Sequence, residues 1–571
     1  APFTNAFWRK FCNVIGCPEL GKDPVYKSFK ERLAMREALG GLLEPVMRTR
    51  TTADWCDRLD KGDVPNGPVL DIKEAIEMEH TRSRGMVAEM DHPVCGKINT
   101  LGTPFHISYA DGSCYETPYS PSPVVGQHST SILGTLLGYD EQQIDAMVDS
   151  NVIRGSDVPG KTRVSAREVA AKDAPEVDDN ERDALPLAGI RVLDLTRMLA
   201  GPYGTLILAD LGADVIKIEE PRLGDPTRHN IPKIGDESTY FMAINRGKRS
   251  VALDLKSEEG KQTLLTLVQT ADIVVENFRP GVMDRLGLGY SDLCKVKQNV
   301  ILCSISGYGQ TGPLRNKISF DLVNQAMAGT MSVTGEAGRP PVRVGLPAGD
   351  LGGGIYAAFG VLAALYNRRQ TGKGAHIDLA LHDILVSLLG YVGQLYFTTG
   401  EVPGPVGSGH HHIAPYRALK AKDGYFIVAA FTQIFWLKFV DAMAMPELKD
   451  DPRFTDITSR KHNMDALYEI ILPLFPGKTV AQWLEIFAAG DVPSARVNTV
   501  GEALECDHAK AREIVFDYEH PTAGKTRTVG TPFRSDGRPC RSGLPSPLLG
   551  EHTEEVLTEL CGEPALHSQG K

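Results

Sequence analysis

The feature that most constrains the fold of this chain is a repeat at a separation of 428 residues. Trp8 and Trp55 correspond to Trp436 and Trp483 when 428 is added to each number. A period this long indicates tandem domains and not a solenoid, whose repeats are about 20 to 50 residues long. Further matches are Pro18-Glu19-Leu20 with Pro446-Glu447-Leu448, Gly-Asp-Val-Pro at 62–65 with 490–493, Gly-Thr-Pro-Phe at 102–105 with 530–533 and, after a four-residue shift, Gly126-Gln127-His128 with Gly550-Glu551-His552.

The repeat divides the chain into two unequal copies. We predict that residues 1–155 are the carboxyl-terminal part of a first, incomplete copy, that 156–186 form a charged, alanine-rich linker, and that 187–571 are a complete second copy. Because 187 is smaller than 428, the first copy has no counterpart of about 187–428. We therefore expect the natural protein to be longer, or the missing segment to exist as a separate or disordered piece. The expected partner is that missing part of the first copy or a second protomer.

Composition favours chemistry on small molecules. The net charge of -11, without a basic block, argues against a nucleic-acid or anionic membrane surface. The ten cysteines show no metal-ligand spacing, so we expect neither zinc nor disulfides. No uninterrupted apolar run reaches the roughly 18 residues that a membrane span needs, and we expect a cytoplasmic protein.

Buried-strand patterns alternate with helical patterns in the second copy. Apolar strand-like runs occur at 190–195, 215–219, 250–253, 273–276 and 300–304. This alternation predicts an α/β fold with a doubly wound parallel sheet, which binds ligands at the carboxyl ends of its strands. No G-x-G-x-x-G follows the first strand, so the pattern disfavours a dinucleotide dehydrogenase.

One acidic residue, Asp350, lies in a glycine-rich stretch that precedes an apolar helical run at 355–365. We expect Asp350 at the amino-terminal end of this helix, where unpaired NH groups and the helix dipole favour an ionised carboxylate. Such a group can act as a nucleophile, or it can simply cap the helix.

Short motifs of glycine, proline and charged residues accompany the strand ends and the Asp350 stretch. Basic residues among them suit a ligand that carries phosphate groups. In chain order the motifs are Leu193-Asp194-Leu195, Ala200-Gly201-Pro202, Gly212-Ala213-Asp214, Asn245-Arg246-Gly247-Lys248-Arg249, Leu253-Asp254-Leu255-Lys256, Asn277-Phe278-Arg279-Pro280-Gly281 and Gly349-Asp350.

With these motifs the chain resembles the family III CoA-transferases (CaiB/BaiF family). The resemblance covers 187–571 and, for the carboxyl-terminal part of a second copy, 1 to about 155. It implies a doubly wound CoA-binding domain, a smaller α/β domain at about 405–530, and an interlocked arrangement of the two fused copies. Coenzyme A enters as a substrate in the form of acyl-CoA, without a metal.

The resemblance also implies site residues. Asp350 would be the catalytic nucleophile, and NH groups of Gly352, Gly353 and Gly354 would stabilise the oxyanion. Glu220 and Leu199 depart from the family pattern, which has an arginine and a glutamine there. The CoA contacts carried over by position are Leu199, Ala200, Leu253, Lys256, Asn277, Phe278, Arg279 and Arg285.

The implied reaction moves CoA from an acetyl-CoA-type donor to a small carboxylic acid. Tandem fusion resembles the dimethylsulfoniopropionate CoA-transferase/lyases, so we expect that sulfonium acid as acceptor, with release of dimethyl sulfide, or else another small or carnitine-like acid. A sulfonium group favours aromatic neighbours. The candidates are Tyr308, Phe320, Tyr416 and Trp436.

Two other functions are weaker predictions. In 2-methylacyl-CoA racemases a histidine occupies the position of Phe320, and a phenyl ring cannot transfer a proton. Alternatively the first copy, which has no counterpart of Asp350, is a non-catalytic scaffold that completes the wall of the active site.

Overall fold

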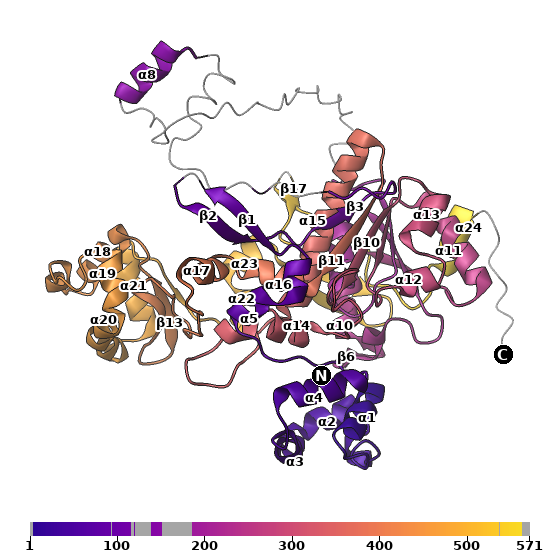
Figure 1. The fold of residues 1–571 in the computed structure, drawn as a ribbon, viewed down its shortest axis with the longest axis horizontal. Helices are drawn as coiled ribbons and strands as arrows, with labels where there is room; N and C mark the ends of the chain where they lie inside the picture. The colour runs from indigo at the N-terminus through magenta and orange to yellow at the C-terminus, as the bar shows by residue number, and fades with distance from the viewer. Residues whose placement is uncertain are drawn as a thin grey trace.

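A computed structural model describes residues 4–92, 94–115, 119, 139–150, 185–535 and 537–561. Figure 1 shows a central α/β unit, a small helical unit formed by α1, α2, α3 (Arg36–Met47) and α4 near the amino-terminus, and a third unit around β13 and α18–α21. The amino-terminal segment continues from the helical unit onto the central unit, where it forms β1, β2 and β3.

The central unit is built on a seven-stranded sheet. Six strands are parallel, and β3 adds to the β11 edge in the antiparallel direction. Counted along the chain, the six parallel strands follow the doubly wound order 3-2-1-4-5-6, whose topological switch point lies between β4 and β9. This confirms the predicted fold class. Across the sheet the strands are β3 (His106–Ser108), β11 (Ala375–Ala380), β10 (Ile301–Ser306), β9 (Ile273–Glu276), β4 (Arg191–Asp194), β5 (Asp214–Glu219) and β8 (Lys248–Ala252).

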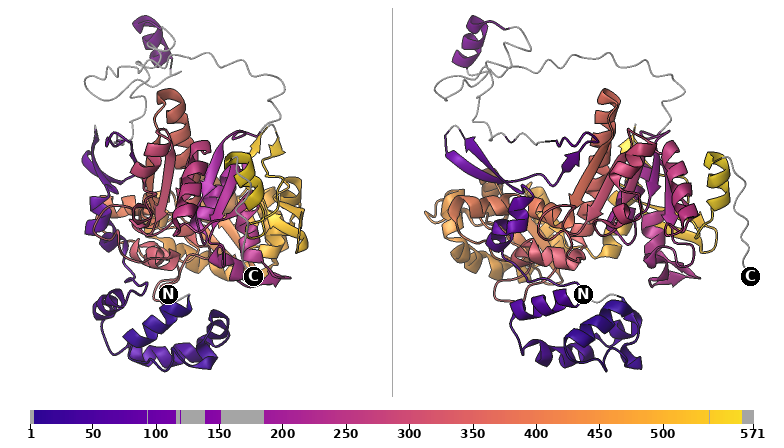
Figure 2. Two further views of the ribbon diagram at one scale, coloured as in Figure 1. Left: turned by 90° about the vertical axis from the view of Figure 1, so that its right-hand side faces the viewer. Right: turned by 45° about the vertical axis from the view of Figure 1, so that its right-hand side comes forward.

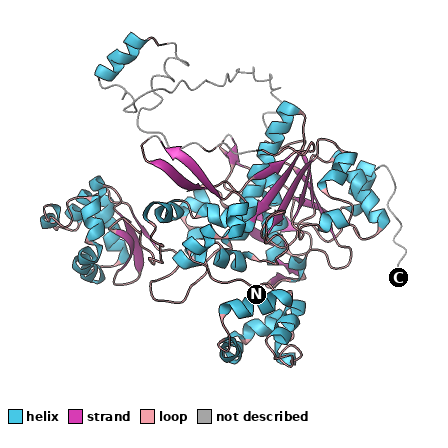
Figure 3. Ribbon diagram, viewed as in Figure 1, coloured by secondary structure: helices cyan, strands magenta, loops and turns pink. Residues whose placement is uncertain are grey.

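Successive residues of each strand face opposite sides of the sheet, because side chains alternate along a strand. Val192 packs in one buried cluster with α9 and α15, whereas Leu193 packs in another with α11, α13 and α24. Helices therefore cover both faces (Figure 3). Their bounds are α9 (Ala200–Asp210), α15 (Ala348–Thr371), α11 (Glu258–Thr270), α13 (Tyr290–Val296) and α24 (Thr553–Cys561).

α15 is the one described helix that is long and apolar enough to meet a length-and-composition test for a membrane span. Half of its apolar window is buried, and it packs on α9 and on the sheet strands β10 and β11. Its apolar character is accounted for by this position as a core helix.

The third unit has its own core, which runs from Ala414 to Val492 and lies within the predicted domain at 405–530. The strands that follow turn back to the central unit, where the guanidinium of Arg246 lies 5.2 Å above the ring of Phe516. The elements of this unit are β12 (Tyr416–Lys420), β13 (Tyr425–Ala429), α18 (Gln433–Ala442), α19 (Ile457–His462), α20 (Met464–Ile471), α21 (Val480–Ala489) and β14 (Ser494–Arg496).

Elements of the amino-terminal segment recur 428 residues later with the same bounds. Contacts recur as well: the indole NH of Trp55 donates to the Met47 carbonyl at 2.8 Å, and that of Trp483 donates to the Phe475 carbonyl at 2.9 Å. The pairs are α1 (Asn5–Val14) with α18, α2 (Phe29–Ala34) with α19, α4 (Thr52–Lys61) with α21, α5 (Ile72–Glu77) with α22 (Val500–Glu505), α6 (Glu79–Ser83) with α23 (Asp507–Ala511), β1 (Val87–His92) with β15 (Val515–His520), and β2 (Gly96–Leu101) with β16 (Gly524–Val529).

The amino-terminal segment is fixed to the central unit by a buried cluster of charges. Arg84 is ion-paired with both Asp378, at 2.9 Å, and Asp383. Its guanidinium lies where any side chain at Gly309 would have to be, and Thr81 shares a 2.9 Å hydrogen bond with His382. The loop after β10 is therefore covered by the amino-terminal segment.

Replacing Arg84 by methionine tests this attachment. The change leaves two buried carboxylates without their cation, so we expect a loss of about 3–5 kcal/mol in the free energy of unfolding. Arg512, which is exposed and lies 428 residues later, provides the matched control: Arg512→Met should change stability by no more than about 0.5 kcal/mol. Thermal unfolding of both variants measures the difference, and equal melting temperatures would contradict the assignment.

Candidate active site

The loops at the switch point of the sheet are joined by paired hydrogen bonds. The Arg197 NH donates to the side-chain oxygen of Asn277 at 2.8 Å, and the Asn277 amide donates back to the Arg197 carbonyl at 2.7 Å. The Arg197 guanidinium lies 5.3 Å from the centre of the Phe278 ring. Asn277, Phe278 and Arg279, which the sequence predicted as CoA contacts, thus lie at the crevice where doubly wound sheets bind ligands.

The first turn of α9 forms the other side of this crevice. Leu199 precedes the helix and Ala200 begins it, and both are buried. Met198 has a left-handed backbone with φ of 69°, although it is not a glycine. Its NH donates a hydrogen bond to the Asp225 carboxylate at 3.3 Å. A left-handed backbone is uncommon for a residue other than glycine, and no sequence pattern predicted it at Met198.

Asp350 is the third residue of α15, so the prediction that it lies at a helix start is confirmed. It does not cap the helix. Asp321, at the start of α14 (Asp321–Met327), accepts hydrogen bonds from the NH groups of Gly349 at 2.8 Å and Asp350 at 3.3 Å. Among the described residues, none donates a hydrogen bond to the Asp350 carboxylate, which is therefore available for chemistry.

The environment of Asp350 favours its protonated form. Burial, and secondarily the Asp321 carboxylate, raise the pKa of Asp350 to about 7. This corrects the expectation that the helix end favours an ionised group: Asp321 already occupies the two NH groups and adds a like charge. Burial, and secondarily the Asp350 carboxylate, also raise the pKa of Tyr240 to about 12, so its hydroxyl keeps its proton.

Gly352, Gly353 and Gly354 lie inside α15, where the NH groups are paired with carbonyls four residues earlier. They are therefore poor oxyanion donors, contrary to the role expected from sequence. Their lack of side chains instead lets α15 pack closely on α9: a Cβ at Gly354 would lie 2.8 Å from the Ala200 carbonyl oxygen and 2.9 Å from the Gly204 nitrogen. This contact brings Asp350, one turn away, next to the first turn of α9.

The remaining predicted CoA contacts are spread along the same edge of the sheet. Leu253 is buried and Lys256 is exposed, both in the loop after β8. Arg285 is exposed at the end of α12 (Val282–Arg285), beside Gly281. Two strands separate β8 from β9, so these groups span about 14 Å. Such a spread fits an extended ligand.

The four aromatic residues predicted to line a substrate pocket do not lie together. Trp436 is 0% exposed in the core of the third unit, and Tyr308 is 1% exposed with its hydroxyl 2.9 Å from the Met327 sulfur. Neither can contact a ligand here, which corrects both predictions. Tyr416 faces His410, at 5.7 Å between ring centres.

Phe320 lies beside Asp321 and contacts the amino-terminal helical unit. Its ring meets that of Phe7 edge-on, with centres 6.2 Å apart. A second contact joins Arg279 to Asp63 at 3.3 Å, and Asp63 also pairs with Lys10 at 2.5 Å. All three charged side chains are substantially exposed, so each pair contributes little to stability. The helical unit thus forms one wall of the candidate site.

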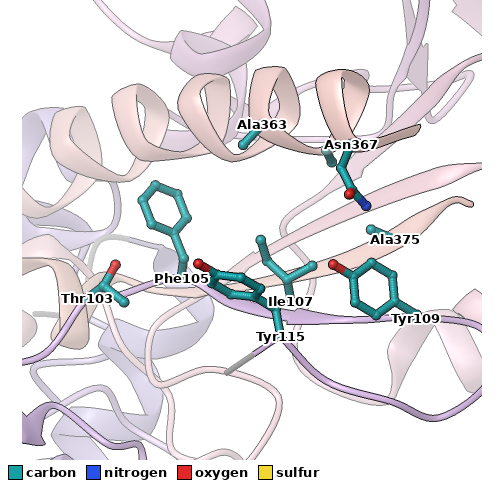
Figure 4. A pocket seen from close by; sticks show the side chains of 9 residues that line it. Thr103, Phe105, Ile107, Tyr109, Tyr115, Ala363, Asn367 and Ala375 are labelled. Atoms are coloured by element: carbon teal, nitrogen blue, oxygen red, sulfur yellow. The ribbon is translucent and has the colours of Figure 1, made fainter. Parts of the chain in front are cut away.

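A separate cavity of about 340 Å³ lies between β3 and the second half of α15 (Figure 4). Phe105, Ile107, Tyr109 and Tyr115 line one side of it, and Asn367 lies on the other. Asn367 is 17 residues after Asp350 in the same helix, or about 25 Å along its axis. The cavity is therefore distinct from the site of Asp350. Within the described ranges, no group of His, Cys, Asp and Glu is arranged to hold a metal ion.

The sequence model of CoA-transferase family III matches residues 1–129 and 187–553. The chain belongs to CoA-transferase family III. It is 36% identical over 387 residues to the succinyl-CoA:glutarate CoA-transferase of Homo sapiens, covering 68% of this chain and 88% of that protein. It is 39% identical over 382 residues to the acetyl-CoA:oxalate CoA-transferase of Acetobacter aceti, covering 66% and 97%.

The structural comparison agrees. A CAIB/BAIF family protein from Brucella suis superposes with a TM-score of 0.59 at 36% identity, covering 66% of this chain and all of that one. As a family III CoA-transferase, the protein is an enzyme that uses a CoA thioester as a substrate.

The contact between α15 and α9 can be tested with matched glycine variants. Gly354→Ala places a methyl group against the backbone of α9, so we expect a loss of about 1–3 kcal/mol in stability and weaker binding of CoA. Gly352→Ala meets only the side chains of Ile384, at 3.1 Å, and Leu388, at 3.6 Å, which a small shift can relieve, so its loss of stability should be smaller than that of Gly354→Ala. Thermal unfolding and calorimetric titration with CoA distinguish them; a tolerated Gly354→Ala would contradict the packing role.

Proposed function

We propose that this protein transfers CoA from an acyl-CoA donor to a small carboxylic acid through covalent intermediates on Asp350. The observation that supports this most directly is a carboxylate without a hydrogen-bond donor among the described residues, in the first turn of α15. A second carboxylate, Asp321, holds that turn by accepting its NH groups. The glycines of α15 bring Asp350 next to the strand-end loops of the sheet.

In the first half-reaction, the ionised Asp350 attacks the thioester carbonyl and expels CoA as a thiolate, which leaves a mixed anhydride. The thiolate then attacks the aspartyl carbonyl and releases the donor acid, giving an aspartyl-CoA thioester. Covalent catalysis of this kind divides one difficult exchange into easier steps. The protonated hydroxyl of Tyr240 is our candidate donor to the oxyanion, in place of the glycines of α15.

In the second half-reaction, the acceptor carboxylate attacks the aspartyl-CoA thioester and forms a new mixed anhydride. The released thiolate attacks the acyl carbon of the acceptor and regenerates the Asp350 carboxylate. The thiolate must stay in place between steps. The CoA phosphates would lie toward Lys256, Arg279 and Arg285.

We propose a small dicarboxylic acid as the acceptor. The two relatives described above are named for glutarate and oxalate, which are both dicarboxylates. Arg343, in the segment that leads to α15, contributes a positive charge that acts on the Asp321 carboxylate and could pair with the second carboxylate of such an acid.

The sulfonium acceptor and its lyase step have no support from these relatives and stay a prediction, as does a carnitine-like acceptor. Two of the four aromatic residues proposed for a sulfonium group are buried in the core. The racemase alternative is weaker still, since Phe320 contacts Phe7 and carries no proton to transfer. An interlocked pair of fused copies, a cytoplasmic location and the absence of nucleic-acid and membrane partners also stay predictions.

Asp350→Asn should reduce CoA transfer by about 10⁴-fold or more, because the amide cannot form the anhydride, while binding of CoA is retained. The assay combines acetyl-CoA or succinyl-CoA with a panel of acceptors: oxalate, glutarate, acetate, the sulfonium acid and a carnitine-like acid. Transfer that survives in the variant would refute the role of Asp350. Preference for acetate over both dicarboxylates would refute only the proposed acceptor, and release of dimethyl sulfide would restore the lyase prediction.

The raised pKa of Asp350 predicts how activity and stability depend on pH. Because the nucleophile must be ionised, kcat/KM should fall as the pH drops through about 7. Asp321→Asn keeps an oxygen that caps the helix but removes the like charge, so the pH at which kcat/KM falls, the acid limb of the profile, should move lower. The folded state binds the Asp350 proton more tightly than the unfolded chain, so stability should decrease from about pH 4 to 7, and Asp350→Asn should flatten that decrease. An acid limb unmoved by Asp321→Asn would contradict the coupling.

A further inference from the structure

Two buried side chains, Lys217 on β5 and Asp225 in the loop after it, hold the loop between β4 and α9. The Lys217 ammonium donates a hydrogen bond to the Thr196 carbonyl at 2.8 Å, and the Asp225 carboxylate accepts one from the Met198 NH at 3.3 Å. The two side chains are ion-paired at 3.1 Å, and both are 0% exposed. In both views of Figure 2, the magenta strands of this region lie in the central sheet, beside the long salmon helix α15.

The left-handed backbone of Met198 depends on this pair. A residue other than glycine keeps such a conformation only where the surrounding structure holds it. Met198 is 38% exposed, so packing of its own side chain does not account for the conformation. Its NH is held by Asp225, and Asp225 is itself fixed by Lys217 and by the NH of Thr227, which donates to it at 2.9 Å. The pair therefore stabilises a turn that the residue at its centre does not favour.

This turn determines where α9 begins. The loop lies directly against the first turn of the helix, because a Cβ at Gly201 would lie 2.3 Å from the Cβ of Thr196. The backbone of Met198 sets the direction of the chain immediately before Leu199 and Ala200. These are the two predicted CoA contacts on this side of the crevice, so their positions follow from the left-handed turn.

The loop also borders the proposed reaction site. A Cβ at Gly354, in the helix of Asp350, would lie 2.8 Å from the Ala200 carbonyl oxygen. Burial, and then the charges of Asp350 and Asp225, raise the pKa of Tyr240, which places both carboxylates near the same hydroxyl. The ion pair thus lies at the end of the sheet where the reaction is proposed to occur.

We propose that Lys217 and Asp225 are positioning residues for the binding of CoA. They fix the left-handed turn at Met198 before the ligand arrives, so Leu199 and Ala200 are already in place. Binding of CoA then does not have to order the loop, and a ligand binds more tightly to a site that is ordered in advance. The inference rests on the proposed function in one respect, the placement of CoA at the crevice between β4 and β9. It does not depend on the covalent steps.

Two double variants, each without both charges, test the pair. Lys217→Met/Asp225→Asn keeps an oxygen that accepts the Met198 NH, whereas Lys217→Met/Asp225→Leu keeps none. In calorimetric titration, CoA should bind about threefold more weakly to the first, which loses the Lys217 contact, and about tenfold more weakly again to the second. The KM for acyl-CoA should rise in parallel. The value of kcat should change by no more than about twofold, because bound CoA orders the loop.

A rescue and a matched control separate positioning from general stability. Glycine adopts a left-handed backbone without strain, so adding Met198→Gly to the leucine double variant should recover at least about threefold in affinity. The control is the buried pair of Arg246 with Asp210, the last residue of α9. Arg246→Met/Asp210→Leu also removes a buried ion pair from this region. It should lower the melting temperature but leave the CoA dissociation constant within about twofold of the wild type.

Single variants of the exposed Met198 test the turn even where the leucine double variant does not fold. Met198→Gly should bind CoA within about twofold of the wild type. Met198→Val should bind about tenfold more weakly, because a β-branched residue disfavours a left-handed backbone. Equal binding of CoA by these two variants overturns the inference.

Hydrogen exchange with and without CoA distinguishes this inference from the placement of CoA. CoA should protect the backbone NH groups of residues 199–203 in the wild type. If it protects none of them, CoA binds elsewhere, and the crevice assignment fails together with the inference. If it protects them, two results overturn the inference alone: equal affinity of the asparagine and leucine double variants, or an equal loss of affinity in the Arg246→Met/Asp210→Leu control.

Discussion

The arrangement of this protein depends on one buried ion cluster, that of Arg84 with Asp378 and Asp383. Two carboxylates in the interior are costly to desolvate, and they are tolerated because a guanidinium from a distant part of the sequence reaches both. The cluster fixes the amino-terminal segment across the β10 end of the sheet. It therefore determines which strand ends are covered, and it leaves the switch point between β4 and β9 as the crevice for a ligand.

At that crevice, two carboxylates have separate roles: Asp321 caps the start of α15, and Asp350 is the proposed nucleophile. A helix start with free NH groups would hold Asp350 ionised but also hydrogen-bonded, and a solvated or hydrogen-bonded carboxylate is a weaker nucleophile. Asp321 takes the NH groups instead, and its own orientation is fixed by Gln325, which donates to it at 2.7 Å. The consequence is a proposed nucleophile whose pKa is raised to about 7 and whose carboxylate accepts no hydrogen bond from the residues that the structure describes.

Local patterns predicted the parts of this structure that local physics determines. The strands of the central sheet were predictable because short apolar runs that alternate with helical patterns are typical of a parallel sheet, and the helix after Asp350 was predictable from its apolar spacing. The roles of Asp321 and of the α15 glycines were not, because they depend on which elements meet: Asp321 lies 29 residues from Asp350, and Gly354 is explained only by α9. Trp436 and Tyr308 show the same limit of sequence-based prediction, because the sequence does not distinguish an aromatic residue that faces a ligand from one that is buried in a core.

The close contact of α9 with α15 constrains how the enzyme can move. Gly204 and Gly354 bring the two helix backbones together without intervening side chains, so the helix of the proposed nucleophile and the helix at the predicted CoA crevice pack directly on each other. Moving one away from the other would break this backbone contact. The opposite wall, the small helical unit, is attached by the edge-on contact of Phe7 with Phe320, the exposed pair of Arg279 with Asp63, and a pair of Asp60 with the largely buried Lys317 at 2.6 Å. The two walls of the site are thus held by contacts of different kinds, backbone against backbone at α9 and α15, and side chain against side chain at the helical unit.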